Sequence, residues 1–285
     1  NWANGAATSA GAVTWGSGAT GISGAVSAAN SLVGTTANDQ VGSFGITALT
    51  NGNYVVRSPS WSNGTATAAG AVTWGNGTTG VSGAVSAANS LVGTSANDLV
   101  GVGGMVDLED NGAYVVSSPN WNNGAATAAG AVTWGNGATG IVGAVWAAGG
   151  LVGTTAGDRV GGGSSGGGIG GIIELANGNY VVNSPLWANG AATIAGAVTW
   201  GNGATGISGA VSATNSLVGA TAGDSVGSAG IFALNNGHYL VLSPNWTNGG
   251  AGTNVGAVTW GSGAAGVSGV VSAANSLVGS TTDDS

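Results

Sequence analysis

Apolar residues in this chain come in short runs separated by polar, glycine-rich segments, and the pattern returns about every 60 residues. In residues 41–99, the run ITAL (46–49) is followed by the turn signal NGN and by YVVRSP (54–59), which predicts a tight β-hairpin. GAVTWG (70–75) predicts a third strand, and VSGAVSAANSLVG (81–93) predicts a fourth. Helical periodicity is missing, and frequent glycine disfavours helices. Each unit is therefore predicted to contain four antiparallel strands.

The repeat of this pattern sets the domain organisation. The motif GAVTW begins at Gly11, Gly70, Gly130, Gly196 and Gly256. The longest interval contains the glycine-rich segment 161–171, which we interpret as an insertion in a loop. The chain is thus one repeat domain whose units cover residues 1–40 (half a unit), 41–99, 100–159, 160–225 and 226–285.

Four short strands per unit are typical of a β-propeller blade, and we expect an all-β propeller. A β-solenoid array is the alternative, although its coils are usually shorter, about 20–30 residues. The tryptophans of the GAVTW motif are predicted to fill the wedge between neighbouring blades. They are Trp15, Trp74, Trp134, Trp200 and Trp260.

Composition restricts the partners. Charged residues make up 4% of the chain, against about 25% in ordinary globular proteins. The net charge of −8 disfavours binding to nucleic acid or to an anionic membrane surface. No apolar run is long enough to span a bilayer, so no membrane insertion is expected. The absence of cysteine excludes disulfides and thiolate metal sites.

Residues 49–74 contain the turn LTNGN, the apolar strand YVVRSP, a loop and the strand GAVTW, in that order. This order resembles the FG-GAP repeat of integrin-alpha-type propellers, in which an apolar strand ending in a small residue and proline is followed by a GAV-aromatic strand. The resemblance implies a propeller with calcium-binding acids in the hairpin loops. Here only the loop EDNGA (109–113) carries acids, so calcium is not carried over and no cofactor is expected. The weak metal candidates are Asp107, Glu109 and Asp110.

The amino-acid sequence of the whole unit is also similar to the repeats of very long secreted bacterial proteins of the haemagglutinin-like or adhesin-like kind. This resemblance implies an extracellular or cell-surface location.

Candidate catalytic groups are nearly absent. His238 is the single histidine, and it replaces Asn53, Ala113 or Asn179 of other units, which indicates a tolerated loop substitution. The aspartates that recur in register are predicted to accept backbone N–H groups in turns, with a weak cation site as the alternative. They are Asp39, Asp98, Asp158, Asp224 and Asp283. We therefore expect a protein that is not an enzyme.

A repeated Trp-x-Asn-Gly motif offers a binding alternative. Tryptophan rings stack on sugars and asparagine bonds hydroxyls, so five copies would form a multivalent lectin. The candidate residues are Trp2, Asn4, Trp61, Asn63, Trp121, Asn123, Trp187, Asn189, Trp246 and Asn248. Core packing explains the same tryptophans without a ligand, and a structural or adhesive repeat module is the favoured function.

The unit count predicts self-association. Five GAVTW strands are accompanied by only four YVVxSP hairpins, so one unit lacks a strand pair. Either the chain is a window from a longer array whose next segment supplies the missing hairpin, or a neighbouring copy supplies it. In the second case unpaired strand edges recruit partners, and strand complementation would build oligomers or filaments.

Overall fold

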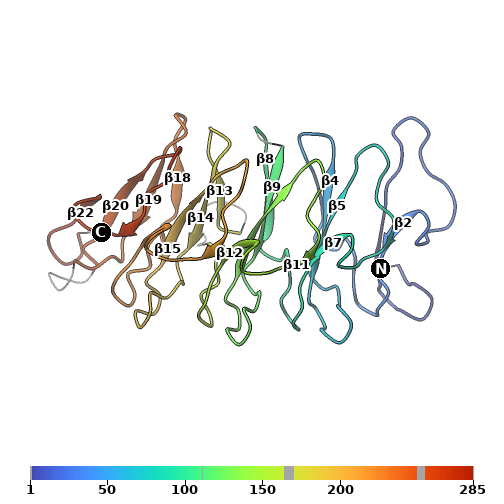
Figure 1. Cartoon of the computed structure of the whole chain (residues 1–285), viewed down its shortest axis with the longest axis horizontal. Helices are drawn as coiled ribbons and strands as arrows, with labels where there is room; N and C mark the ends of the chain where they lie inside the picture. The colour runs from blue at the N-terminus through green and yellow to red at the C-terminus, as the bar shows by residue number, and fades with distance from the viewer. Residues whose placement is uncertain (1, 111, 164–169, 249–253, 285) are drawn as a thin grey trace.

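The five units fold into five separate β-sheets that stand in a row along the longest axis of the molecule, with the two termini at opposite ends (Figure 1). The structure is a computed structural model that describes residues 2–110, 112–163, 170–248 and 254–284. All regular structure in these residues is β-strand. Part of the glycine insertion, residues 164–169, lies outside the described residues.

The second sheet shows how one unit folds. The predicted hairpin is confirmed, because β3 (Ile46–Ala48) pairs antiparallel with β4 (Tyr54–Ser58). Strand β5 (Ala71–Gly75) follows, and β7 (Ser90–Val92) lies on its other side. The fifth strand, β11 (Gly143–Ala144), comes from the next unit and pairs parallel with β7.

The third and fourth sheets repeat this order. The third contains β8 (Gly104–Leu108), β9 (Ala113–Ser118), β10 (Ala131–Asn136), β12 (Gly150–Val152) and β16 (Gly209–Ala210). The fourth contains β13 (Ile172–Glu174), β14 (Tyr180–Ser184), β15 (Ala197–Gly201), β17 (Ser216–Val218) and β21 (Gly269–Val270).

The two end sheets have fewer strands. The first contains β1 (Ala12–Thr14), β2 (Ser31–Val33) and β6 (Gly83–Ala84), in agreement with the half unit expected there. The fifth contains β18 (Ile231–Ala233), β19 (Tyr239–Ser243), β20 (Ala257–Gly261) and β22 (Ser276–Val278). Among the described strands, none pairs with the outer edge of β22.

The prediction of one continuous fourth strand over 81–93 was wrong. Asn89 breaks it, because its side chain accepts the N–H of Ser86 and donates to the carbonyl of Ala84. The two halves consequently pair with different sheets. The early half is a linking strand that joins the preceding unit, and the linking strands are β6, β11, β16 and β21.

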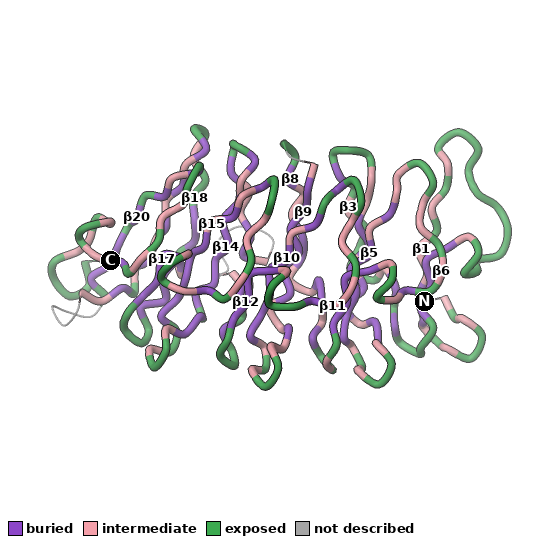
Figure 2. Tube along the Cα trace, in the orientation of Figure 1, coloured by how far each residue is buried: buried purple, intermediate pink, exposed green. Residues whose placement is uncertain are grey.

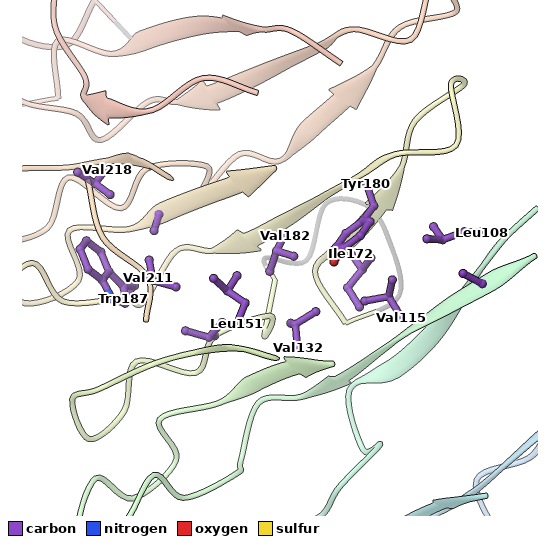
Figure 3. Packing of buried hydrophobic residues seen from close by; sticks show 13 residues of the cluster. Leu108, Val115, Val132, Leu151, Ile172, Tyr180, Val182, Trp187, Val211 and Val218 are labelled. Atoms are coloured by element: carbon purple, nitrogen blue, oxygen red, sulfur yellow. The ribbon is translucent and has the colours of Figure 1, made fainter. Parts of the chain in front are cut away.

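The described residues do not close into the ring expected of a propeller, and the sheets form an open row instead (Figure 1). Buried residues lie on the strands along the whole row (Figure 2). One buried cluster joins Val115, Val132 and Leu151 to Val182 and Val218 of the next unit (Figure 3). Each of the three inner units therefore packs its two faces against two different neighbours.

Candidate functional site

The most elaborate feature is the interface between consecutive units, which occurs four times in nearly the same form. The sequence SPSW (58–61) makes a turn in which the N–H of Trp61 donates to the carbonyl of Ser58, 3.0 Å away. Pro59 fits the second position of such a turn because its φ is fixed. The turn directs Trp61 into a cluster that contains Leu32 of the preceding unit and Val41. The YVVxSPxW motif is thus a strand followed by an inter-unit anchor.

Four of the candidate sugar-binding tryptophans lie in this interface, and four of the candidate asparagines bond within their own units. Trp61, Trp121, Trp187 and Trp246 are each at most 5% exposed, while Trp2 of the first unit is partly exposed. Asparagine side chains of the same motif donate to backbone carbonyls 2.9 Å away. The pairs are Asn4 to Gly34, Asn63 to Gly93, Asn123 to Gly153 and Asn189 to Gly219. Asn248 is partly exposed. The four buried tryptophans present no free ring face, which favours packing over sugar stacking.

Buried aspartates accept backbone N–H groups in turns, as predicted, and they also bond the next unit, which was not predicted. Asp98 Oδ2 accepts the N–H groups of Thr94 and Ser95 in its own turn, at 2.9 and 2.8 Å. Its Oδ1 accepts the N–H of Asn122 in the next unit, at 3.0 Å. Asp39, Asp158 and Asp224 do the same toward Ser62, Ala188 and Thr247.

The fifth aspartate of this series was assigned wrongly. Asp284, rather than Asp283, accepts the N–H groups of Ser280 and Thr281 in the last unit. It stands five residues after Gly279, as Asp98 stands five residues after Gly93. The hydrogen bond from the Thr281 hydroxyl, and then those from the N–H groups of Thr281 and Ser280, lower the pKa of the exposed Asp284 carboxyl.

Four of the five GAVTW tryptophans lie between neighbouring units as predicted, whereas Trp260 of the last unit is 52% exposed. The indole N–H of Trp74 donates to the carbonyl of Gly137 in the next unit, at 2.9 Å. Gly140 of that unit lies against the same side chain, and a Cβ there would come 2.6 Å from the Trp74 Cβ. Equivalent indole bonds run from Trp15, Trp134 and Trp200.

The acidic metal candidates lie near Glu174, a residue that the sequence interpretation missed. Asp107 Oδ2 accepts the N–H of Thr50, and Glu174 Oε1 accepts the N–H of Glu109. Partial burial raises the pKa of Glu174, and the nearby Glu109, Asp107 and Asp110 carboxylates raise it further. In the part of the chain that the structure describes, no three acidic or histidine side chains converge in a way that would hold a metal ion.

His238 makes the same hydrogen bond as the asparagine that occupies this position in other units. Its Nδ1 accepts the N–H of Gly263 at 3.1 Å, just as Asn53 Oδ1 accepts that of Gly77 and Asn179 Oδ1 that of Gly203. This agrees with a tolerated loop substitution.

The sequence interpretation missed two recurring contacts. The first is made by the asparagine that breaks the fourth strand. The second is a hydrogen bond between a threonine of the GAVTW strand and a serine of the neighbouring strand, as in Thr73 and Ser90 at 2.7 Å. Recurrence in register across units was the signal that could have identified both.

A row of stacked β-sheets, built from one repeated unit and linked by exchanged strands, defines a linear β-repeat protein. A family model described as a repeat of unknown function, DUF5650, matches the chain in five segments: 1–43, 48–102, 109–162, 174–228 and 233–285. The chain therefore belongs to this family. A comparison with curated proteins found no match. In the described residues there is also no helix capable of spanning a membrane.

Proposed function

We propose that this protein is a non-enzymatic structural repeat module, a spacer that holds its two ends apart outside the cell. The observation that carries the proposal is the inter-unit interface, which recurs four times along one straight row. Each copy combines a buried tryptophan, a buried aspartate, an indole hydrogen bond and a linking strand. Such an array sets a length by the number of its units.

The composition supports a role outside the cell. Small polar side chains, rather than charges, satisfy the backbone, and only two basic residues are present in 285. A protease that cleaves after lysine or arginine finds few sites on such a chain. The likeness to FG-GAP repeats supports the unit as a four-stranded blade, and the likeness to adhesin-like repeats supports the location.

Removal of one unit tests the proposal. Deleting residues 71–130 joins Gly70 to Ala131, so the repeat register is kept. We expect a folded protein that is shorter by roughly one sheet-to-sheet distance, about 10 Å. Spin labels at exposed loop positions of the first and last units would measure the change. An unchanged end-to-end distance, or a particle that becomes narrower rather than shorter, would contradict a linear spacer.

The deletion has a matched control. Deleting residues 76–135 removes the same number of residues and joins Gly75 to Asn136, again in register. Both deletions should shorten the row equally, because each removes one complete repeat period.

A further inference from the structure

One turn of the repeated unit carries a tryptophan only in the third unit. This turn follows the linking strand, and in the second unit it has the sequence SAAN (86–89). The same four residues occur at 27–30 and 272–275, and the fourth unit has SATN (212–215). In the third unit the sequence is WAAG (146–149), so Trp146 and Gly149 replace the serine and the asparagine. We call the turns 86–89, 146–149 and 212–215 the flank turns.

The replacement places an indole ring on the surface, with space made for it in the backbone. Trp146 is 45% exposed, and a Cβ on Gly149 would overlap the Cε2 and Cζ2 atoms of its ring. Val142 is 50% exposed and shares the outer face with Trp146, because Val145 is buried and alternate residues of an extended segment face opposite sides. We call Val142 and Trp146 the flank platform.

The third unit lacks hydrogen bonds that the same turn makes elsewhere. In the second unit, the N–H of Ser86 and the hydroxyl of Ser90 both donate to Asn89 Oδ1, at 2.9 Å each. Turn 146–149 has no asparagine to accept them, and Thr133 Oγ1 is left buried without a partner. A local loss of this kind, made together with a newly exposed aromatic ring, is typical of a functional site.

Stacking of the units leaves the flank platform uncovered. The third unit has a neighbour on both sides, and in those neighbours the positions of Val142 and Trp146 also face solvent. Ser82 and Ser208, the equivalents of Val142, are exposed, and Ser86 and Ser212, the equivalents of Trp146, are partly exposed. The exposure of the platform is therefore a property of the interior of the row.

The next unit along the row has a cleft at its own flank turn. The cleft measures about 190 Å³ and is lined by Trp200, Ile207, Thr214, Asn215 and residues 265–268 of the fifth unit. Thr214 and Ser268 are exposed, and Thr214 stands where the other units have alanine. Since Asn215 is the equivalent of Gly149, the platform and the cleft occupy the same turn of two consecutive units.

We propose that these two flank turns bind an extended, neutral oligosaccharide, with a sugar ring stacked on Trp146 and a following part of the chain in the cleft. The apolar face of a sugar ring fits an exposed indole, and hydroxyl and amide side chains exchange hydrogen bonds with sugar hydroxyls. Stacked sheets lie about 10 Å apart, so a ligand that reaches both turns is a chain of sugars. The inference goes beyond the proposed spacer role, because it depends on these two turns and not on the length of the row.

Charge and size favour a glycan over a protein partner. Residues 111–157 and 175–223, which include both turns, contain no charged side chain, so the turns offer no ion pair to a charged ligand. A stable protein interface buries about 800 Å² on each partner. The platform consists of two large apolar side chains, which match a sugar ring in size rather than a protein surface. We therefore expect a glycan and not a second copy of the chain.

Isothermal titration calorimetry with cellohexaose and with chitohexaose, two neutral β-1,4-linked oligosaccharides, tests the site. Extended chains are chosen because the units form a straight row. The 285-residue chain should bind at least one of them. Trp146→Ser gives the turn the serine of the other units and should weaken binding by roughly tenfold or more, as expected for an aromatic anchor. Trp146→Tyr keeps an aromatic ring and should bind more tightly than Trp146→Ser.

Thr214→Ala tests the cleft, because it restores the alanine of the other units and removes a hydroxyl. It should weaken binding by about threefold to tenfold, the effect of one hydrogen bond. Leu186→Ser is the matched control. Leu186 is 42% exposed, its equivalent in the second unit is Ser60, and it belongs to neither the platform nor the cleft. This variant should bind like the parent.

Several results would overturn the proposal: a parent that binds neither oligosaccharide, or equal binding by the parent and either Trp146→Ser or Thr214→Ala. A parent that dimerises in sedimentation velocity while Trp146→Ser stays monomeric, with no sugar bound by either, would show that the platform is a protein contact instead. Circular dichroism checks that each variant folds. If Trp146→Ser does not fold, the comparison of the parent with Trp146→Tyr and Thr214→Ala decides, because both should bind more weakly than the parent.

Discussion

At the residue scale, small polar side chains form hydrogen bonds with buried backbone groups of this protein. Ser58 Oγ accepts the N–H of Gly42 at 3.1 Å, and Ser118 and Ser243 do the same for Gly101 and Gly227. Buried backbone groups that find such partners avoid a desolvation cost of about 1–3 kcal/mol each. In a chain with 4% charged residues, these hydrogen bonds satisfy the buried backbone without ion pairs.

In the third unit one buried threonine lacks the serine partner found in the other units, and Gly150→Ser should restore this hydrogen bond. Thr133 Oγ1 is buried without a partner, because Gly150 stands where other units have the serine that bonds this threonine. A serine at position 150 is expected to raise the free energy of unfolding by about 1 kcal/mol. Urea unfolding measures the change.

The converse substitution is the control. Ser90→Gly removes the partner of Thr73 in the second unit and should lower the free energy of unfolding by a similar amount. Equal stability of both variants and the parent would show that this hydrogen bond contributes nothing.

At the element scale, turns and linking strands couple each unit to its neighbour. The turn 94–98 is closed by Asp98 and at the same time bonded to the next unit, while β11 adds a parallel strand to the second sheet. Folding of one unit therefore assists the next, as nearest-neighbour models of repeat proteins describe.

Asp98→Ala should weaken this coupling strongly. The substitution leaves the N–H groups of Thr94, Ser95 and Asn122 without their acceptor, the buried Asp98 carboxylate. Because residues 94, 96 and 97 of the turn are exposed, water can replace part of these bonds, and we expect a loss of about 1–3 kcal/mol in the free energy of unfolding. Chemical denaturation provides the measurement.

Asp110→Ala serves for comparison, because Asp110 is exposed in a hairpin loop. It should change stability by less than about 0.5 kcal/mol. A loss at position 98 no larger than the loss at position 110 would show that the buried carboxylate does not couple the units.

At the scale of the whole molecule, the buried tyrosines should make the free energy of unfolding depend on pH in the alkaline range. Tyr114, Tyr180 and Tyr239 are fully buried one per unit, and a Cβ on Gly135 would overlap the ring of Tyr114. Burial raises the pKa of Tyr239 to about 12, an effect that the N–H of Val267 partly offsets. Burial likewise raises the pKa of Tyr114 and Tyr180.

The sign of the pH dependence follows from these shifts. A raised pKa means that the folded protein prefers the neutral phenol, so the stabilisation is complete below about pH 10 and is lost as pH rises toward 12. Urea midpoints between pH 8 and 11.5 should therefore fall with pH.

Tyr239→Phe gives the control for this dependence. The variant should show a shallower decline, because one of the titrating groups is gone. A decline of the same steepness, or stability that rises with pH, would contradict the role of the buried phenols.

The sequence by itself determined the features that rest on local pattern: the all-β class, the unit length, the hairpin of β3 and β4, and the role of aspartate in turns. Strand alternation and turn residues act over a few neighbouring positions, so they can be interpreted without knowledge of the fold. The same rules led to a wrong register at Asp283, because a second aspartate adjoined the true position.

The sequence already favoured core packing for Trp61 and its equivalents, and their burial confirms it. Only the tertiary structure decided that the units form an open row and that the segment 81–93 divides between two sheets. A ring and a row can be built from the same blade, and they differ in the small rotation between neighbouring sheets. That rotation depends on how Trp74 meets Gly140 and how Trp61 meets Leu32, residues from different units. Contacts of this kind are set by packing across the interface, which the pattern within one unit does not contain.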